Sequence, residues 1–440
     1  MKKFYFLTVL LILFLFTTSQ AQTPQWYLLP DSPPQGRYDD LYFINAFTGW
    51  AVGEGSVSRI IKSTNGGINW QLLSSLNNSY SRAICFLDSV NGFIGTLNGS
   101  QHLYRTTDGG HNWAYVDLKD DSILGICGLN SFGNTILGSG MYSGYPRIVI
   151  STDRGSTWRV KNLVAYANAL VDCYLVNETE AFVTGGIGST YANRRSVILY
   201  TSNAGETWET RFTSNRAGNW GWKISFPSQT TGYVSLENNN LEDTSYFAKT
   251  TDGGITWSEK LYGAGLNFRE QGIGFVNETT GWMGGYTKFY VTTNGGNDWN
   301  QLNLNPEFTS INRIRFYGDT LGYAGGKRIY KYTTDNTIGV SGTQHILPVE
   351  IALHQNYPNP FNPVTTIKYE IFETSMSKIT IYNVSGEEIF SYSNGFRAPG
   401  NFEFMWFGTD HRGRQVPSGV YFYTLETENH IETKKMILVR

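Results

Sequence analysis

An eight-residue motif, Ser/Thr-x-Asp/Asn-x-Gly-x-x-Trp, recurs six times between residues 63 and 299. Successive copies begin 43, 45, 50, 49 and 42 residues apart, at Ser63, Thr106, Ser151, Thr201, Thr250 and Thr292. A period of this length is typical of small β-sheet units that are stacked or arranged around an axis. The motif therefore predicts an all-β repeat protein.

Each residue type in the motif suits a tight turn between two strands. A short Asp or Asn side chain accepts backbone N–H groups of its own turn, and the glycine two residues later suits positive φ. The Trp covers the turn with a large apolar face. We therefore predict structural roles for Asn65, Asp108, Asp153, Asn203, Asp252 and Asn294, and for Trp70, Trp113, Trp158, Trp208, Trp257 and Trp299. The motif resembles the Asp-box (BNR) repeat of sialidase-like β-propellers, which implies a structural turn remote from any active site.

A second pattern, Phe-x5-Gly followed by an aromatic residue, precedes most of the boxes and predicts a hairpin. It begins at Phe43, Phe86, Phe226, Phe275 and Phe316. Two hairpins per period make the four-stranded blade of a propeller. The unit at Phe316 lacks a complete box, whereas residues 25–29 read like the strand that follows a box. We expect a seven-bladed propeller at residues 22–336, closed by an N-terminal strand that carries Trp26.

The N-terminus has the pattern of a secretory signal peptide. Lys2 and Lys3 precede an apolar run at residues 4–16, and small residues flank a cleavage site after Ala21. This run is shorter than the roughly 20 residues that cross a bilayer, so we predict a signal peptide at residues 1–21 and no transmembrane segment. Removing its two lysines changes the net charge from −2 to −4. So small an acidic excess argues against a nucleic-acid partner.

The three cysteines occupy one register of three successive repeats, at Cys85, Cys127 and Cys173. Equivalent positions on neighbouring blades should lie beyond the roughly 7 Å that limits a disulfide-bonded Cα pair. We therefore expect buried core thiols. The six histidines do not cluster, and no Cys/His spacing indicates a metal site. We predict no metal and no cofactor.

The repeat pattern ends after Asn336, and residues 337–350 are predicted to be a linker. Residues 351–440 contain Asn356-Tyr357-Pro358-Asn359-Pro360, then alternating strands, and end on Lys434-Lys435-Met436-Ile437-Leu438. The pattern predicts a small Ig-like β-sandwich. These segments resemble the type A C-terminal sorting domain of the type IX secretion system. The resemblance implies export through the periplasm, the secretion machinery as a partner, and a secreted or outer-surface location; an adhesive Ig-like module is the alternative.

Two repeats are longer than the others, and their extra residues fall before the box, at 186–196 and 236–246. In a four-stranded blade these insertions project from the face opposite the boxes, which is where repeat proteins usually bind partners. Arg and aromatic side chains on this face suit sugars, carboxylates or protein surfaces. The candidate binding residues are Arg82, Arg194, Arg216, Trp220, Arg269 and Arg313. Core packing is the alternative role for each aromatic residue.

The repeat is also similar to that of the photosystem II assembly and stability factors, as in Ile273–Gly285 followed by Val291–Trp299. Those propellers are non-catalytic scaffolds that contact a client protein through a basic patch, a part to which Arg82, Arg269 and Arg313 correspond here. We expect a non-catalytic binder of protein or glycan, with the ligand unidentified. The alternative is a sialidase-like or glucan-acting glycoside hydrolase, which needs a carboxylate pair; Asp39, Asp40, Asp120, Asp121 and Glu270 are its candidates.

Overall fold

The structure is a computed structural model. It describes residues 23–29, 31–33, 36–54, 57–77, 79–97, 99–120, 122–140, 145–238, 244–263, 269–302, 310–334, 351–371, 375–397, 400–427 and 431–440. The expected signal peptide and linker, together with Asp121, lie outside these residues. Within them no helix is long and apolar enough to cross a membrane.

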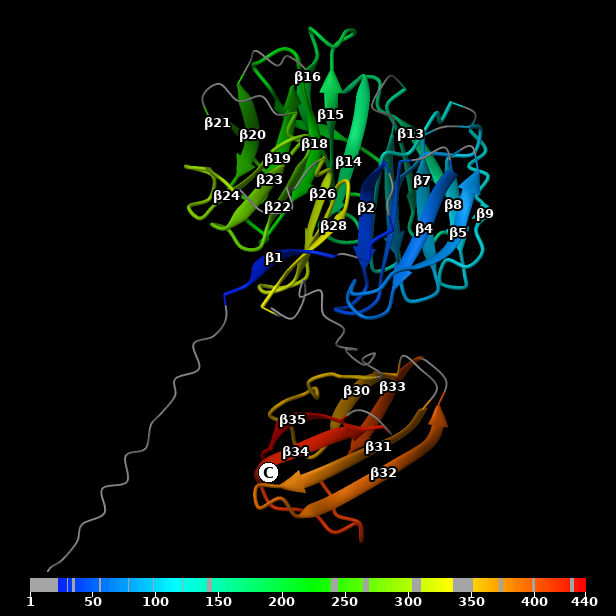
Figure 1. The fold of residues 1–440 in the computed structure, drawn as a ribbon, viewed down its shortest axis with the longest axis vertical. Helices are drawn as coiled ribbons and strands as arrows, with labels where there is room; N and C mark the ends of the chain where they lie inside the picture. Colours follow the sequence, from blue (N-terminus) through cyan, green and yellow to red (C-terminus); the bar gives the residue numbers. More distant parts are fainter. Residues whose placement is uncertain are drawn as a thin grey trace, which may run out of the picture.

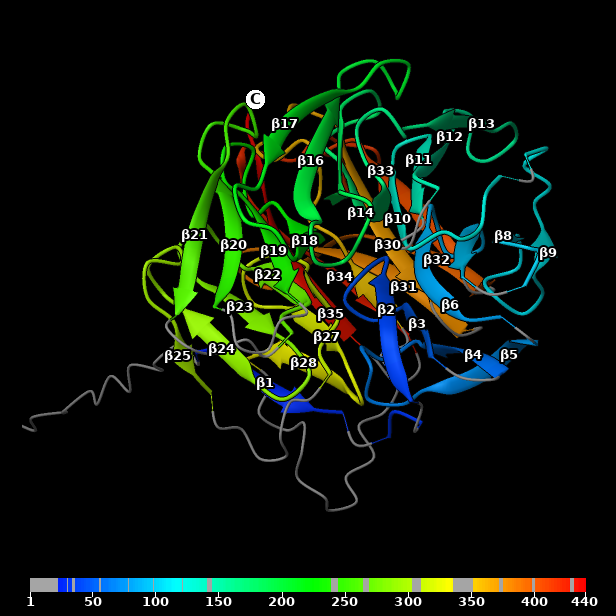
Figure 2. The ribbon, with the colours of Figure 1, turned by 90° about the horizontal axis from the view of Figure 1, so that it is seen from above.

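The described residues form seven four-stranded antiparallel sheets in a ring, followed by a sandwich of two further sheets (Figures 1 and 2). This arrangement confirms the predicted fold class. In the first six sheets the strands follow chain order from the axis outward, and the first strands of neighbouring sheets pack against one another.

Blade 1 contains β2 (Arg37–Phe43), β3 (Gly49–Glu54), β4 (Val57–Ser63) and β5 (Gln71–Asn77). Blade 2 contains β6 (Ser81–Phe86), β7 (Gly92–Thr96), β8 (Leu103–Thr106) and β9 (Ala114–Tyr115). Blade 3 contains β10 (Gly128–Phe132), β11 (Thr135–Gly140), β12 (Arg147–Ser151) and β13 (Arg159–Asn162). Blade 4 contains β14 (Ala169–Leu175), β15 (Ala181–Ile187), β16 (Arg195–Thr201) and β17 (Glu209–Thr213).

Blade 5 contains β18 (Asn219–Ser225), β19 (Gly232–Asn238), β20 (Ser245–Thr250) and β21 (Ser258–Gly263). Blade 6 contains β22 (Gly272–Phe275), β23 (Gly281–Gly284), β24 (Phe289–Thr292) and β25 (Asn300–Gln301). Blade 7 contains β26 (Arg313–Phe316), β27 (Gly322–Gly325), β28 (Ile329–Thr333) and, as its outer strand, β1 (Gln25–Leu28).

The N-terminal strand closes the ring, as the sequence predicts. β1 pairs antiparallel with β28, and Trp26 lies opposite Tyr332. Trp26 is buried in a cluster with Trp282, Phe289 and Tyr332 that spans blades 6 and 7. The first and last segments of the propeller are thereby joined by both backbone pairing and core packing.

The boxes form self-contained turns. In blade 2 the Thr106 hydroxyl donates to Asp108 Oδ1 (2.8 Å) and accepts the N–H of Gly110 (2.9 Å). The N–H of Asn112 donates to Asp108 Oδ1 (2.9 Å), and Trp113 Nε1 donates to the Gly110 carbonyl (3.0 Å). Hydrogen bonds from Asn112 hold the pKa of Asp108 below its usual range. The turn satisfies its own polar groups, so its geometry calls for no ligand.

The Phe-x5-Gly pattern has a packing cause. A Cβ added to Gly49 would lie 2.4 Å from the ring of Phe43 on the paired strand, and the equivalent distances at Gly92, Gly232, Gly281 and Gly322 are 2.3–2.6 Å. The Phe ring therefore lies flat over the glycine, where no side chain fits. Phe43 also stacks on Tyr323 of the neighbouring blade, with ring centroids 3.7 Å apart.

Two sheets form the C-terminal sandwich. One contains β29 (Ile351–Leu353), β30 (Thr365–Ile371) and β33 (Gly400–Trp406); the other contains β32 (Glu388–Arg397), β31 (Ser375–Asn383), β34 (Gly419–Glu426) and β35 (Ile431–Leu438). Its core is built around the buried Trp406, Ile367 and Tyr423. The sandwich is therefore a second hydrophobic core, separate from those of the propeller.

Cys85, Cys127 and Cys173 are buried in the propeller, and none of the three is in a disulfide. Burial raises the pKa of the Cys85 thiol to about 12. The expectation of buried core thiols at these positions is confirmed.

Candidate functional site

β-bulges at the start of the first strands turn charged residues toward the propeller axis. The register of β2 shifts between Tyr38 and Asp40, that of β6 between Ser81 and Ala83, and that of β14 between Leu170 and Asp172. A bulge inserts an extra residue and re-aims the neighbouring side chains. Asp39 and Arg82 are such extra residues, and both are buried. Gly53 lies beside the first bulge, where a Cβ would come within 1.9 Å of the Arg37 carbonyl oxygen.

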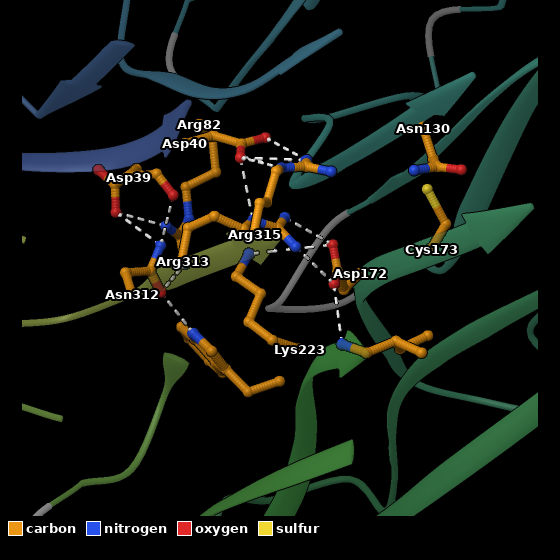
Figure 3. A network of polar contacts seen from close by, with 12 residues as sticks. Asp39, Asp40, Arg82, Asn130, Asp172, Cys173, Lys223, Asn312, Arg313 and Arg315 are labelled. Atoms are coloured by element: carbon orange, nitrogen blue, oxygen red, sulfur yellow. Dashed lines mark hydrogen bonds and ion pairs between the residues drawn. The ribbon is translucent and has the colours of Figure 1, made fainter. Parts of the chain in front are cut away.

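The side chains from these strands form one buried network of ion pairs, which we call the axial network (Figure 3). It consists of Asp39, Asp40, Arg82, Asp172, Lys223, Asn312, Arg313 and Arg315. Arg313 is its hub: Nη1 and Nη2 donate to the two carboxylate oxygens of Asp172 at 2.9 and 2.8 Å, and Nε lies 2.9 Å from Asp40 Oδ1.

A second part of the axial network is centred on Asp39. Its carboxylate pairs with Arg82 and lies 2.6 Å from Arg37 Nη2. Asn312 Nδ2 donates to Asp39 Oδ1 (3.1 Å), while Trp222 Nε1 donates to Asn312 Oδ1 (2.7 Å). The contacts join strands of blades 1, 2, 5 and 7 across the axis.

The charges of the axial network are balanced by its protonation states. Burial alone would raise the pKa of Asp172, but Arg313 and Lys223 lower it to about 2. Burial, together with the neighbouring Arg313, lowers the pKa of Lys223 to about 7. The carboxylates of Asp39, Asp40 and Asp172 pair with the three guanidinium groups of Arg82, Arg313 and Arg315. Asp39 and Asp40, which the hydrolase hypothesis proposes as catalytic, are ion-paired here and fully buried.

Two buried glutamates lie beside the axial network. Gln271 Nε2 donates to Glu237 Oε1 (2.8 Å), and Ser245 Oγ donates to Glu270 Oε2 (2.8 Å). Burial raises the pKa of Glu237 to about 7 and holds that of Glu270 well above its usual range. Glu270 is one of the candidate carboxylates; Glu237 was not predicted, and it lies on β19. Asp120, another candidate, accepts hydrogen bonds from Ser122 in a loop of blade 2.

The structure does not bring the six candidate binding residues into one patch. Arg82 and Arg313 are buried in the axial network. The Arg194 guanidinium lies over the ring of Trp220, 4.6 Å from its centroid. Arg216 and Arg269 lie over other rings, at 4.0 Å from Tyr246 and 5.5 Å from Tyr286. Arg82 and Arg313 therefore do not form an exposed basic patch with Arg269, because both lie buried on the inner strands of their blades, Arg82 at the bulge in β6.

A groove of about 540 Å³ opens between blades 3 and 4 on the face opposite the boxes. Its lining comes from residues 145–147 at the start of β12, from 162–168 between β13 and β14, and from 189–194 between β15 and β16. It is lined by Tyr145, Pro146, Arg147, Asn162, Val164, Asn168, Ser189, Tyr191 and Arg194. Of the predicted binding residues, only Arg194 lines it. Among the described residues, no group of three His, Cys, Asp or Glu side chains is placed to hold a metal.

Residues 355–439 match the family described as "Secretion system C-terminal sorting domain". The C-terminal sandwich is a type IX sorting domain. It directs the chain to the cell surface or to secretion. No curated protein sequence matches the chain.

Solved structures resemble this chain in fold. YCF48 from Cyanidioschyzon merolae has a TM-score of 0.54 at 16% identity, covering 71% of this chain and 99% of its own. A structure of YCF48 bound to D1 peptide has a TM-score of 0.52 at 18% identity, with 71% and 97% covered. An ancestral GH74 enzyme has a TM-score of 0.53 at 12% identity, with 93% and 63% covered. At such identities the likeness concerns the β-propeller fold alone.

The sorting domain contacts the face of the propeller that carries the Asp boxes (Figure 1). Asn45 Nδ2, in the loop after β2, donates to Glu370 Oε2 of β30 (3.0 Å). A cavity of about 230 Å³ lies between the two domains and is lined by Asn45 and Asp108 on one side and by Glu370 and Asn401 on the other. The groove between blades 3 and 4 opens on the other face of the ring, away from this contact.

Proposed function

We propose that this exported propeller is a non-catalytic recognition module that captures its ligand on the face opposite the Asp boxes. The axial network carries the proposal. Its aspartates are buried and held by guanidinium groups, and a carboxylate in this state is available neither as a nucleophile nor as an acid. A glycosidase needs two carboxyl groups that reach the scissile bond.

The placement of the sorting domain also supports the face opposite the Asp boxes as the binding face. A contact on the box face leaves the loops between second and third strands open to solvent on the opposite side, where loops commonly carry binding residues. Arg216 and Arg269 lie around this opposite face, whereas Arg194 packs over the buried Trp220 with only 6% of its side chain exposed and meets solvent at the groove that it lines. In this proposal these residues contribute to capture, whereas Arg82 and Arg313 hold the scaffold that positions them.

The YCF48 structures support binding rather than catalysis as the mode of action, since one of them is a propeller bound to D1 peptide. We take from that complex only that a propeller of this fold binds a partner. The ligand of this chain is a protein or glycan met outside the cell, because its sorting domain directs it there.

One observation favours the alternative, a glycoside hydrolase. Glu237 and Glu270 are adjacent buried acids with raised pKa values, and a protonated carboxyl group at neutral pH is what a general acid requires. Both side chains are at most 4% exposed, however, and each is hydrogen-bonded to a neighbouring side chain. Because both carboxyl groups are buried and hydrogen-bonded, a substrate cannot reach them unless the neighbouring side chains move. We therefore favour recognition over hydrolysis.

The test measures capture and turnover on the same sample. The secreted full chain is screened against defined glycans and surface proteins, and release of reducing sugar is assayed alongside. Binding that is lost in Arg269→Ala or Arg194→Ala but kept in Ile255→Ala, an exposed residue of the box face, supports the proposal. Sugar release that disappears in Glu237→Gln would replace it with the hydrolase.

A further inference from the structure

We infer that the groove between blades 3 and 4 is an oligosaccharide subsite, with Tyr145 and Tyr191 as its stacking surfaces. The inference rests on the proposed function and names the ligand class for one part of the opposite face. The two tyrosines come from different blades, and their side chains are 56% and 53% exposed. The Tyr191 ring packs edge-on against Trp220, with ring centroids 5.0 Å apart, yet about half of each tyrosine side chain stays exposed to a ligand.

The backbone at Tyr145 points to a role beyond folding. Its φ is 52°, in the left-handed region that a bulky residue rarely occupies. A non-glycine side chain is strained in this region because its Cβ crowds the neighbouring carbonyl oxygen. Glycine would remove this strain, and more than half of the Tyr145 side chain is exposed. The chain thus holds an aromatic ring at the mouth of the groove against a local energetic cost.

The amide side chains of the groove are fixed with their donors available. Asn168 Oδ1 accepts the N–H of Gly188 (2.7 Å), and Asn162 Oδ1 accepts the N–H of Val164 (2.9 Å). These bonds to backbone donors settle the orientation of both amides. Neither Nδ2 group donates a hydrogen bond among the described residues, although both asparagines line the groove. Two oriented N–H₂ groups are therefore offered to a ligand.

Arg147 adds a third donor group. Its Nε donates to Ser122 Oγ (2.9 Å) and its Nη1 to Asn162 Oδ1, which holds the guanidinium plane beside the amide. Arg194 lines the other wall, over the ring of Tyr191. The nine lining residues include no Asp or Glu. A matching ligand is rich in acceptor oxygens, as the hydroxyl, ring and carboxylate oxygens of a sugar are.

This combination favours a saccharide over a peptide. A pyranose ring places its C–H face on an aromatic ring while its rim of oxygens meets planar amide and guanidinium groups. A peptide that extends a sheet needs a length of open strand edge, yet of the outer strand β13 only its last residue, Asn162, lines the groove. Beyond the two tyrosines, the apolar lining is limited to Pro146 and Val164, which are small anchors for a peptide side chain.

The experiment uses the full secreted chain on an array of defined neutral and uronate-containing oligosaccharides, with a random peptide library as a parallel arm. Tyr145→Ala and Tyr191→Ala should each weaken binding of the best oligosaccharide about tenfold, while Tyr191→Phe keeps most of it. The matched control is Tyr115→Ala, an exposed tyrosine of β9. Tyr286→Ala, whose ring lies under Arg269 elsewhere on the opposite face, reports binding outside the groove. Unchanged melting temperatures establish that the variants are folded. The neutral and uronate arms identify which sugar supplies the acceptors.

Three results would overturn the inference. Oligosaccharide binding that survives both groove variants but is lost in Tyr286→Ala places the ligand elsewhere and leaves the proposed function standing. Peptide binding that is lost in Tyr145→Ala, without any sugar binding, changes the ligand class of the groove. Binding that is lost only in box-face variants contradicts the groove and the proposed function together.

Discussion

Replacement of Arg313 by Met tests whether the axial network is the part of the fold that joins the blades. Met preserves much of the side-chain length and removes the guanidinium that binds Asp172 and Asp40. Arg313 and Lys223 hold the pKa of Asp172 at about 2, below its ordinary value of about 3.9, so the ionised carboxylate stabilises the fold by about 2–3 kcal/mol. Breaking a buried ion pair by removing one partner costs about 3–5 kcal/mol. We therefore expect Arg313→Met to lower the unfolding free energy by about 3–5 kcal/mol at pH 7.

The pH dependence gives a second readout of the same variant. Because the pKa of Asp172 is depressed in the folded state, its contribution is present above about pH 4 and is lost as the pH falls toward 2. The difference between wild type and Arg313→Met should therefore shrink as the pH falls through this range. Both chains are unfolded in urea and followed by tryptophan fluorescence, with unfolding free energies compared from pH 7 downward.

The matched control is Arg154→Met, which breaks a partly exposed ion pair with Asp88. It should cost less than about 1 kcal/mol. In a double-mutant cycle, Asp172→Asn should recover part of the loss caused by Arg313→Met, because the uncompensated charge is gone. If Arg313→Met costs no more than Arg154→Met, the axial network does not hold the blades together and the reasoning is refuted.

Three further predictions concern other parts of the chain. Trp26→Ala should cost about 3–5 kcal/mol in unfolding free energy, since it empties the core between blades 6 and 7; an unchanged melting temperature would contradict closure by β1. The folded pKa of Lys223, about 7, is depressed below its unfolded value, so wild-type stability should rise between pH 7 and about 10. Lys223→Met should abolish this rise and increase the unfolding free energy at pH 7 by more than about 1 kcal/mol. Absence of that rise in the wild type would refute the burial argument. Deletion of residues 351–440 should leave the propeller in the periplasm, as cell fractionation would reveal; normal release would contradict export through the sorting domain.

The fold could be predicted from the sequence because its signals are local and repeated. Asp108, Gly110 and Trp113 form a turn whose hydrogen bonds all lie within eight residues, so one copy already specifies the structure. Closure by Trp26 could be predicted because residues 25–29 repeat the strand that follows each box. The sorting domain could also be predicted from the sequence, since its several motifs occur in a fixed order.

The candidate site was harder to predict because its contacts are long-range. Arg313 binds Asp172, which is 141 residues away, and nothing near either residue indicates the pairing. Bulges reverse the direction of individual side chains, so Arg82 faces the axis although its place in the repeat suggested the surface. The consecutive acids Asp39 and Asp40 and the close-packed Gly53 were the available signals of a bulge at the start of β2.

The groove was missed for a related reason. Tyr145 and Tyr191 lie in loops of separate blades. In the sequence, each is a single aromatic residue within a polar loop, which does not indicate a binding site. The long insertion at 186–196 correctly indicated the face, since residues 188–194 connect β15 to β16 there. Only the neighbouring loop of blade 3 completes the site, and its contribution follows from the ring arrangement rather than from the sequence of either loop.

The most direct test of recognition without catalysis is to bind the immobilised full chain to its best array ligand and measure retained ligand and newly formed reducing ends together over hours. We predict saturable binding, full recovery of intact ligand, and loss of binding in variants of the opposite face. Accumulation of reducing ends that depends on Glu237 or Glu270 would contradict this prediction and identify the chain as a glycoside hydrolase.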